Sequence, residues 1–143
     1  MMKRIRSHGM SLLSLTAALV FVGTWAFAQT AGNPETEMKT AMAHAGYAAK
    51  ADALNGVHMH LHHVLNCMVG PQDKLFDGAA GNPCKDQGTG VLPELKGRMN
   101  QQYYEATLVA QIAGQGIASN NLPEAKAAAR VAELILQDAV TAK

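Results

Sequence analysis

Residues 50–56, which read Lys-Ala-Asp-Ala-Leu-Asn-Gly, decide how many helices this chain forms. Without a break there, residues 34–68 would form one helix of about 52 Å at ~1.5 Å per residue. Asn55-Gly56 is a strong turn signal, and Asp52 is suited to cap a new helix. A break within residues 50–56 predicts four helices of comparable length and hence a four-helix bundle. One long helix in a three-helix arrangement is the alternative.

Proline followed by glutamate marks three helix starts outside this segment, at Pro34-Glu35, Pro93-Glu94 and Pro123-Glu124. Proline in the first helical turn gives up only an amide that would have no partner there, and glutamate suits the positive end of the helix dipole. Asn121 lies three residues before Glu124, in a spacing close to a capping box. Helices are therefore expected to begin near residues 34, 93 and 123.

Two amphipathic helices are predicted in the second half of the chain, because their apolar residues recur every three or four positions. The first has a stripe of Leu95, Met99, Tyr103, Ala106, Ala110, Ala113 and Ile117. The second has an apolar side of Ala127, Ala128, Val131, Leu134, Ile135 and Ala139, opposite Lys126, Arg130, Glu133 and Gln137. The small residues on both stripes predict close packing.

Residues 69–92 read as an irregular loop, because glycine and proline interrupt them repeatedly. The two cysteines of the chain, Cys67 and Cys84, lie at one end of the loop and within it. In an exported protein an isolated cysteine pair is normally a disulfide, and closing a loop of this size contributes roughly 3 kcal/mol. A disulfide-pinned loop is therefore expected, with a metal-binding thiolate pair as the alternative.

Residues 1–28 have the order of a secretory signal peptide. Basic Lys3-Arg4-Ile5-Arg6 precedes an apolar run, and Ala26-Phe27-Ala28 precedes Gln29. The apolar run of about 16 residues is shorter than the ~20 that a membrane span needs. We expect cleavage to leave residues 29–143 as one helical-bundle domain in the periplasm or outside the cell.

The mature chain would carry 9 Lys and Arg against 11 Asp and Glu, a net charge of −2, and only four aromatic residues. This composition argues against nucleic-acid binding, which needs positive charge and stacking side chains. No basic amphipathic face remains for a membrane surface either. The mature chain is rich in alanine, the strongest helix former, and this predicts an all-α, small antiparallel helical bundle.

Residues 57–68, Val-His-Met-His-Leu-His-His-Val-Leu-Asn-Cys-Met, are the one feature that is not generic. On a helix, His58 and His62 lie along one edge of the apolar face, and His60 and His63 lie along the other. Imidazoles spaced four residues apart can reach one metal ion. Imidazole suits copper, zinc and nickel, of which copper binds most tightly. A solvated polar face or a pH-sensitive surface is the alternative.

The pair formed by His58 and His62 is favoured as the open metal site, because the loop joined to Cys67 is expected to cover the other two histidines. His44 would lie ~21 Å from His58 on an unbroken helix, but a reversal of the chain would bring it close from the neighbouring helix. Met38 and Met42 are spaced four residues apart and suit a softer Cu(I) site. Core packing is the alternative for these methionines.

These features suggest first a small exported metal-binding protein for sequestration or delivery, with copper favoured over zinc or nickel. A non-covalent haem protein for electron transfer or sensing is the second hypothesis, with His58 or His62 and Met99 as candidate axial ligands. The third is a cofactor-free interaction module that binds through residues 69–92. A periplasmic protein or a second copy of the chain would be the partner. An enzyme is least supported, because no acid–base pair stands at helical spacing with a nucleophile.

Overall fold

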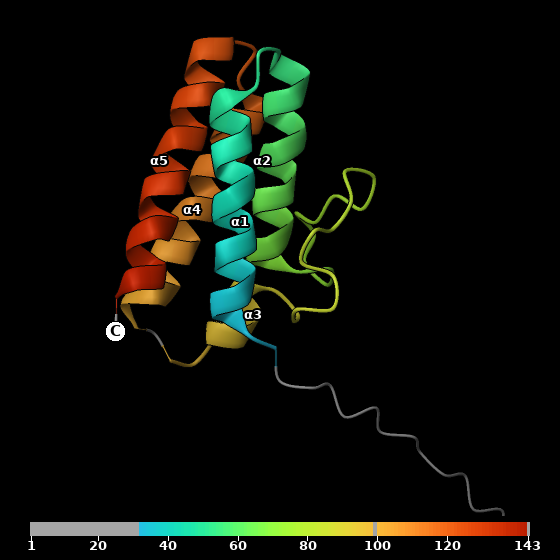
Figure 1. Ribbon diagram of the computed structural model, residues 1–143. Helices are drawn as coiled ribbons and strands as arrows, with labels where there is room; N and C mark the ends of the chain where they lie inside the picture. The colour runs from blue at the N-terminus through green and yellow to red at the C-terminus, as the bar shows by residue number, and fades with distance from the viewer. Residues whose placement is uncertain (1–31, 99, 143) are drawn as a thin grey trace, which may run out of the picture.

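The computed structural model describes residues 32–98 and 100–142, and it is an all-helical bundle (Figure 1). Its helices are α1 (Pro34–Lys50), α2 (Leu54–Val69), α3 (Val91–Leu95), α4 (Gln101–Ala118) and α5 (Leu122–Thr141). The four long helices are antiparallel neighbours, and the described residues contain no strand. Both α1 and α4 pack against α2 and α5, so α1 and α4 are diagonal to each other. This confirms the predicted four-helix bundle. The predicted signal peptide and Met99 lie outside the described residues.

The break between α1 and α2 falls within the predicted segment, at residues 51–53. Its details differ from the prediction. Ala53 is the N-cap of α2, no side chain caps the helix, and Asn55-Gly56 lies inside the first turn. The capping role predicted for Asp52 is therefore wrong. We attribute the start of α2 at Leu54, ahead of the turn signal Asn55-Gly56, to the burial of Val57 in the core. Tertiary packing takes precedence here over a local turn signal.

Two helix starts follow the predicted proline chemistry. The side chain of Asn33 accepts a hydrogen bond from the amide of Thr36 at 3.1 Å, beside Pro34 in the first turn of α1. Asn121 caps α5 in the same way by accepting from the amide of Glu124 at 3.2 Å. These caps satisfy amides that have no partner within the helix.

The prediction of one continuous helix over residues 95–117 is wrong at its beginning. Leu95 is the last residue of the five-residue helix α3, and a turn with Gly97 at a φ of +95° follows it. Asn100 then caps α4 by accepting from the amide of Tyr103 at 3.1 Å. The left-handed backbone at Gly97 ends the first helix, and the Asn100 cap starts the second.

The apolar face predicted for α5 is rotated in the structure. The buried stripe consists of Ala125, Ala129, Ala132, Leu136 and Ala139. Val131 and Leu134, which were expected to face the core, are 44% and 57% exposed. Alanine is common on both sides of this helix, so the periodicity of apolar residues did not distinguish the buried side.

Small residues allow the helices to approach closely, as predicted. A Cβ added at Gly116 of α4 would lie 2.6 Å from a methyl of Leu61 in α2 and 2.9 Å from the Cβ of Ala128 in α5. The large buried side chains are few beside the many buried alanines; the largest that are fully buried include Met38, Leu61, Met68, Leu95 and Leu136. The core therefore contains few large apolar side chains.

The Cys67–Cys84 disulfide is present, and both cysteines are buried. This excludes the alternative of a metal-binding thiolate pair, because neither sulfur is free. The irregular segment between α2 and α3 lies along one side of α2 in Figure 1. Disulfides persist in oxidising compartments, and the bond is consistent with the predicted export.

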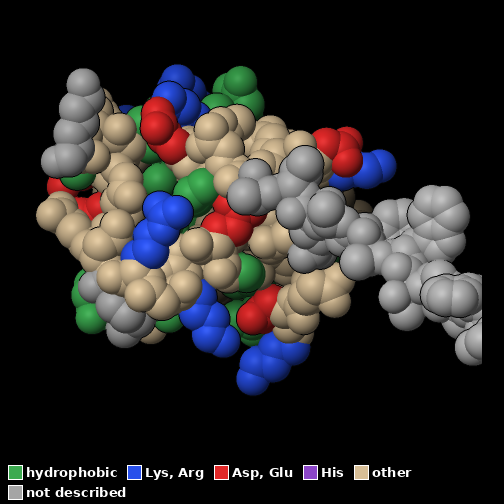
Figure 2. Space-filling view, turned by 90° about the horizontal axis from the view of Figure 1, so that it is seen from below, with side chains coloured by type: hydrophobic (Ala, Val, Ile, Leu, Met, Phe, Trp, Pro, Cys, Tyr) green, Lys and Arg blue, Asp and Glu red, His purple; other side chains and the backbone are tan. Residues whose placement is uncertain are grey.

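Charged side chains of both signs are interspersed at the end of the bundle seen in Figure 2. None of the helices in the described part of the chain combines the length and the hydropathy that crossing a membrane requires.

Candidate metal centre

Three histidines meet where α1 and α2 lie side by side. His44 comes from α1, and His60 and His63 come from α2. The Nδ1 atom of His44 lies 3.1 Å from Nδ1 of His60 and 3.1 Å from Nδ1 of His63. The ligand nitrogens of the three residues all lie within 4.8 Å of one another. We call this group the histidine cluster. Within the described part of the chain, no other three His, Cys, Asp or Glu residues meet this criterion.

The position of the break explains why these three meet. His44 and His60 are each eight residues from Asp52, the middle of the reversal. In two antiparallel helices of equal rise, residues equidistant from the reversal lie at the same height. His63 follows His60 by three residues and so lies on the same face of α2. The helix break thus assembles the histidine cluster.

Protons cannot satisfy all the nitrogens of the histidine cluster. His63 Nε2 lies 2.6 Å from the carbonyl oxygen of Ala80, which can only accept, so Nε2 carries the hydrogen. Whenever the His63 ring carries a single hydrogen, its Nδ1 then has a bare lone pair. A hydrogen on His44 Nδ1 can point toward Nδ1 of only one neighbour, His60 or His63. If His44 Nδ1 carries no hydrogen, its lone pair faces the lone pair on Nδ1 of His63. A metal ion accepts lone pairs from all three nitrogens at once.

Two of the three nitrogen spacings, those from His44 to His60 and to His63, are close to those of a tetrahedral site. Metal–nitrogen bonds of 2.0–2.1 Å at tetrahedral angles place ligand nitrogens about 3.3–3.4 Å apart. The two contacts of His44 are 3.1 Å, so each needs to lengthen by a few tenths of an ångström. The nitrogens of His60 and His63 lie within 4.8 Å of each other, and both rings would turn toward a bound ion. An all-imidazole set suits copper, zinc and nickel, and three protein ligands leave a fourth position open.

The surroundings favour the uncharged form of two of the rings, those of His44 and His60. Burial, and then the nearby His63 and His60, lower the pKa of His44 to about 4. Burial and His63 also lower the pKa of His60. Neutral imidazole is the form that binds metals. The ring of Tyr47, which is 55% exposed, lies 5.6 Å from that of His44 and 5.5 Å from that of His60 between centroids. Tyr47 thus forms the outer side of the cluster.

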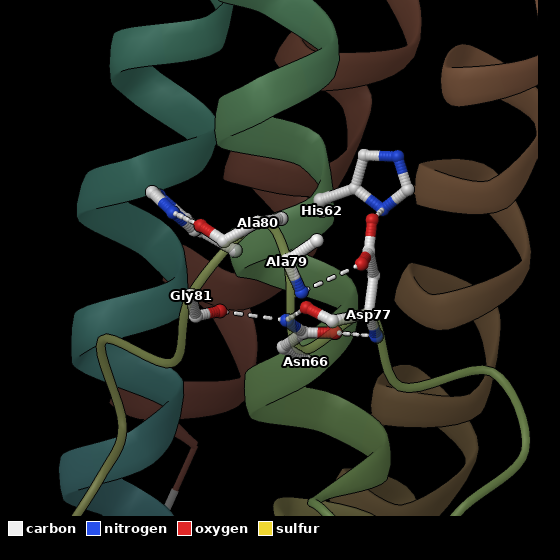
Figure 3. A network of polar contacts seen from close by, with 7 residues as sticks. His62, Asn66, Asp77, Ala79, Ala80 and Gly81 are labelled. Atoms are coloured by element: carbon white, nitrogen blue, oxygen red, sulfur yellow. Dashed lines mark hydrogen bonds and ion pairs between the residues drawn. The ribbon is translucent and has the colours of Figure 1, made fainter.

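His58 and His62, the favoured pair, have separate protein partners. Nε2 of His58 lies 2.9 Å from the carbonyl oxygen of Ser119, at the end of α4. Nδ1 of His62 lies 3.4 Å from a carboxylate oxygen of Asp77 in the loop (Figure 3). The structure groups His44 with the other two histidines of α2 instead. The equal distance of His44 and His60 from the break is the sequence signal that would have indicated this grouping.

The other predicted ligands are the two methionines of the proposed Cu(I) site and the candidate haem ligands. Met38 is fully buried in the core, in agreement with its core-packing alternative, and Met42 is partly buried. Met42 and Tyr47 line a shallow groove of about 350 Å³ between α1 and α5. The candidate haem ligands His58 and His62 have the partners described above.

No protein-family model, curated protein or solved structure significantly matches this chain. Any function is therefore to be inferred from the geometry of the site itself.

Proposed function

We propose that this is a small exported metal-binding protein that binds one first-row divalent ion through His44, His60 and His63. The observation that carries the proposal is that three imidazole nitrogens from two helices lie within 4.8 Å of one another. Copper is the favoured ion, because it binds such donors more tightly than zinc or nickel does.

Reversible binding for sequestration or delivery suits this cluster better than a permanent structural role. Structural zinc sites are closed by four protein ligands, whereas three ligands leave a position for water or for a ligand from an acceptor. All three histidines are only half-buried, so an acceptor can reach the ion. A periplasmic protein or a second copy of the chain would be the acceptor. Protons compete for the imidazoles, so binding is expected to weaken in acid.

The test is a metal titration of the untagged protein, since a polyhistidine tag would bind the same ions. After removal of metal with a chelator, Cu(II), Zn(II) and Ni(II) are added separately in competition with a chromophoric chelator. One ion per chain is expected, with affinity in the order copper, then nickel or zinc. The single substitutions His44→Ala and His63→Ala should each weaken binding strongly.

The double substitution His58→Ala/His62→Ala is the matched control, because it removes two histidines of the same helix and leaves the histidine cluster complete. It should retain one ion per chain. Binding that disappears in the control but survives His44→Ala would move the site to the favoured pair of the sequence analysis. Absence of binding in the unsubstituted protein would overturn the proposal.

A further inference from the structure

The loop segment 77–81 is held against α2 by one buried side chain, that of Asn66, which is 1% exposed (Figure 3). Its amide nitrogen donates to the carbonyl oxygens of Asp77 and Gly81, both at 2.7 Å. Its amide oxygen accepts from the backbone N–H of Asp77 at 2.8 Å. Both ends of the segment are thus attached to the same residue of α2.

The carbonyl oxygen of Ala80 lies between these attachment points and is 2.6 Å from Nε2 of His63. Gly81 has a φ of +91°, and this torsion sets the plane of the peptide that carries the Ala80 oxygen. L-residues other than Asn and Asp rarely adopt such a φ. The direction of the carbonyl therefore depends on glycine at position 81 and on the three hydrogen bonds of the Asn66 side chain, which we call the Asn66 clamp.

We infer that Asn66 is a positioning residue for the metal centre, acting through the Ala80 carbonyl. That carbonyl holds the His63 ring as its Nε2–H tautomer, with the Nδ1 lone pair directed at His44, 3.1 Å away. Hydrogen bonds from the second nitrogen of a ligating histidine fix its tautomer and orientation in metal sites generally. The consequence for metal affinity depends on the proposed function, whereas the tautomer of His63 does not.

His58 provides an internal comparison on the same helix. Its Nε2 also approaches a backbone carbonyl, that of Ser119 at 2.9 Å, but no contact of Asn66 involves that segment. A change confined to His63 would thus report on the clamp, while a change in both histidines would report a general disturbance of α2.

The first experiment is long-range ¹H–¹⁵N NMR of the imidazoles in the metal-free protein and in Asn66→Asp. Aspartate retains an acceptor for the Asp77 amide but cannot donate to the two carbonyls. The unsubstituted protein should show His63 with a protonated Nε2 and a bare Nδ1. In the variant, His63 should become a mixture of tautomers, while His58 remains unchanged.

A second pair of variants covers the case in which Asn66→Asp does not fold. Gly81→Ala disfavours the positive φ and so turns the Ala80 carbonyl, while the Asn66 side chain is unchanged. Its Cβ would lie 3.7 Å from Nε2 of His63, which is an ordinary contact. Gly78→Ala is the matched control in the same loop, because a Cβ there would lie 3.7 Å from the Phe76 ring, an ordinary contact. Only Gly81→Ala should alter the His63 tautomer.

Metal affinity is the second readout. Asn66→Asp and Gly81→Ala should lower the affinity for the metal about 10- to 100-fold, and Gly78→Ala should leave it unchanged. A protonated Nδ1 on His63 in the unsubstituted protein would overturn the inference, as would folded Asn66→Asp and Gly81→Ala variants with an unchanged tautomer and affinity. If the unsubstituted protein binds no metal, the proposed function fails, and the NMR result still decides whether Asn66 positions His63.

Discussion

Glu37 is a carboxylate buried in the core of the bundle, and its titration should control stability near neutral pH. It lies in α1 and is 1% exposed. One carboxylate oxygen accepts from the amide of Gly90 at 2.9 Å, while the other is buried without a hydrogen-bond partner. Burial first, and then the charge of Glu94, raise the pKa of Glu37 to about 7, although the Gly90 hydrogen bond opposes the rise. We expect the protonated form to be the stable one inside the protein.

The size of the effect follows from the difference between the folded and unfolded states. Glu37 titrates near 4.5 when unfolded and near 7 when folded. Each unit of pKa corresponds to about 1.4 kcal/mol, so the full difference is worth about 3 kcal/mol. Because the folded pKa is the higher one, this stabilisation is present below pH 4.5 and is lost as the pH rises through 7. The lowered pKa of His44 acts in the opposite direction, since its contribution is lost as the pH falls below 6.5.

The perturbation is Glu37→Gln, and the assay is urea denaturation from pH 5 to 8.5. Glutamine retains an acceptor for the Gly90 amide and cannot ionise. The variant should match the unsubstituted protein in acid and exceed it by up to about 3 kcal/mol at pH 8.5. Taking the difference between the two proteins cancels the histidines. Glu35→Gln, on the exposed side of α1, is the control and should not reproduce the gain of about 3 kcal/mol at pH 8.5. Two parallel curves, or a Gln variant that is weaker at every pH, would refute the reasoning.

Three other predictions concern packing, the disulfide and the metal. Cys67→Ser/Cys84→Ser should cost about 3 kcal/mol by urea denaturation, because the bond closes a separation of 17 residues; no loss would show that the loop is held without it. Gly116→Ala should destabilise the protein by about 1–3 kcal/mol through overpacking, whereas Gly114→Ala, with nothing within 4 Å, should stabilise it slightly; thermal melting distinguishes them. Copper at 100 times its dissociation constant should add about 2.7 kcal/mol of stability, and His44→Ala should abolish the gain in a thermal-shift assay.

The architecture was largely predictable because its signals are local. Alanine content, proline at helix starts and the turn-forming residues of 50–56 each describe only a few neighbours in the chain. The predictions were wrong where contacts between residues distant in the sequence decide where a helix begins or which side of it is buried. The start of α2 depends on Val57 entering the core, and the buried side of α5 depends on which alanines meet α1 and α4. No local pattern contains that information.

The site was predictable only in part, for a related reason. The spacing of His58 and His62 is visible in the sequence, whereas the approach of His44 depends on where the chain reverses. A reversal of the chain predicts that His44 approaches from the neighbouring helix, and His44 does so. The partners of the favoured pair, the Ser119 carbonyl and Asp77, come from segments 61 and 15 residues away. Their proximity follows from the assembled bundle rather than from the helical pattern.

The alanine-rich composition and the histidine cluster are connected through the distance between helices. Packed helix axes lie 8–10 Å apart, depending on the side chains at the contact. On α1 the residues buried around His44 are all small: Ala41, Ala45, Gly46, Ala48 and Ala49. Small side chains at such positions favour the lower end of that range. An imidazole is short, so a close approach of the two helices favours the 3.1 Å contacts between His44 of α1 and His60 and His63 of α2. Leucine at position 41 or 48 would enlarge the core but move the helices apart. The small number of large core side chains and the assembly of the histidine cluster thus depend in part on the same alanines.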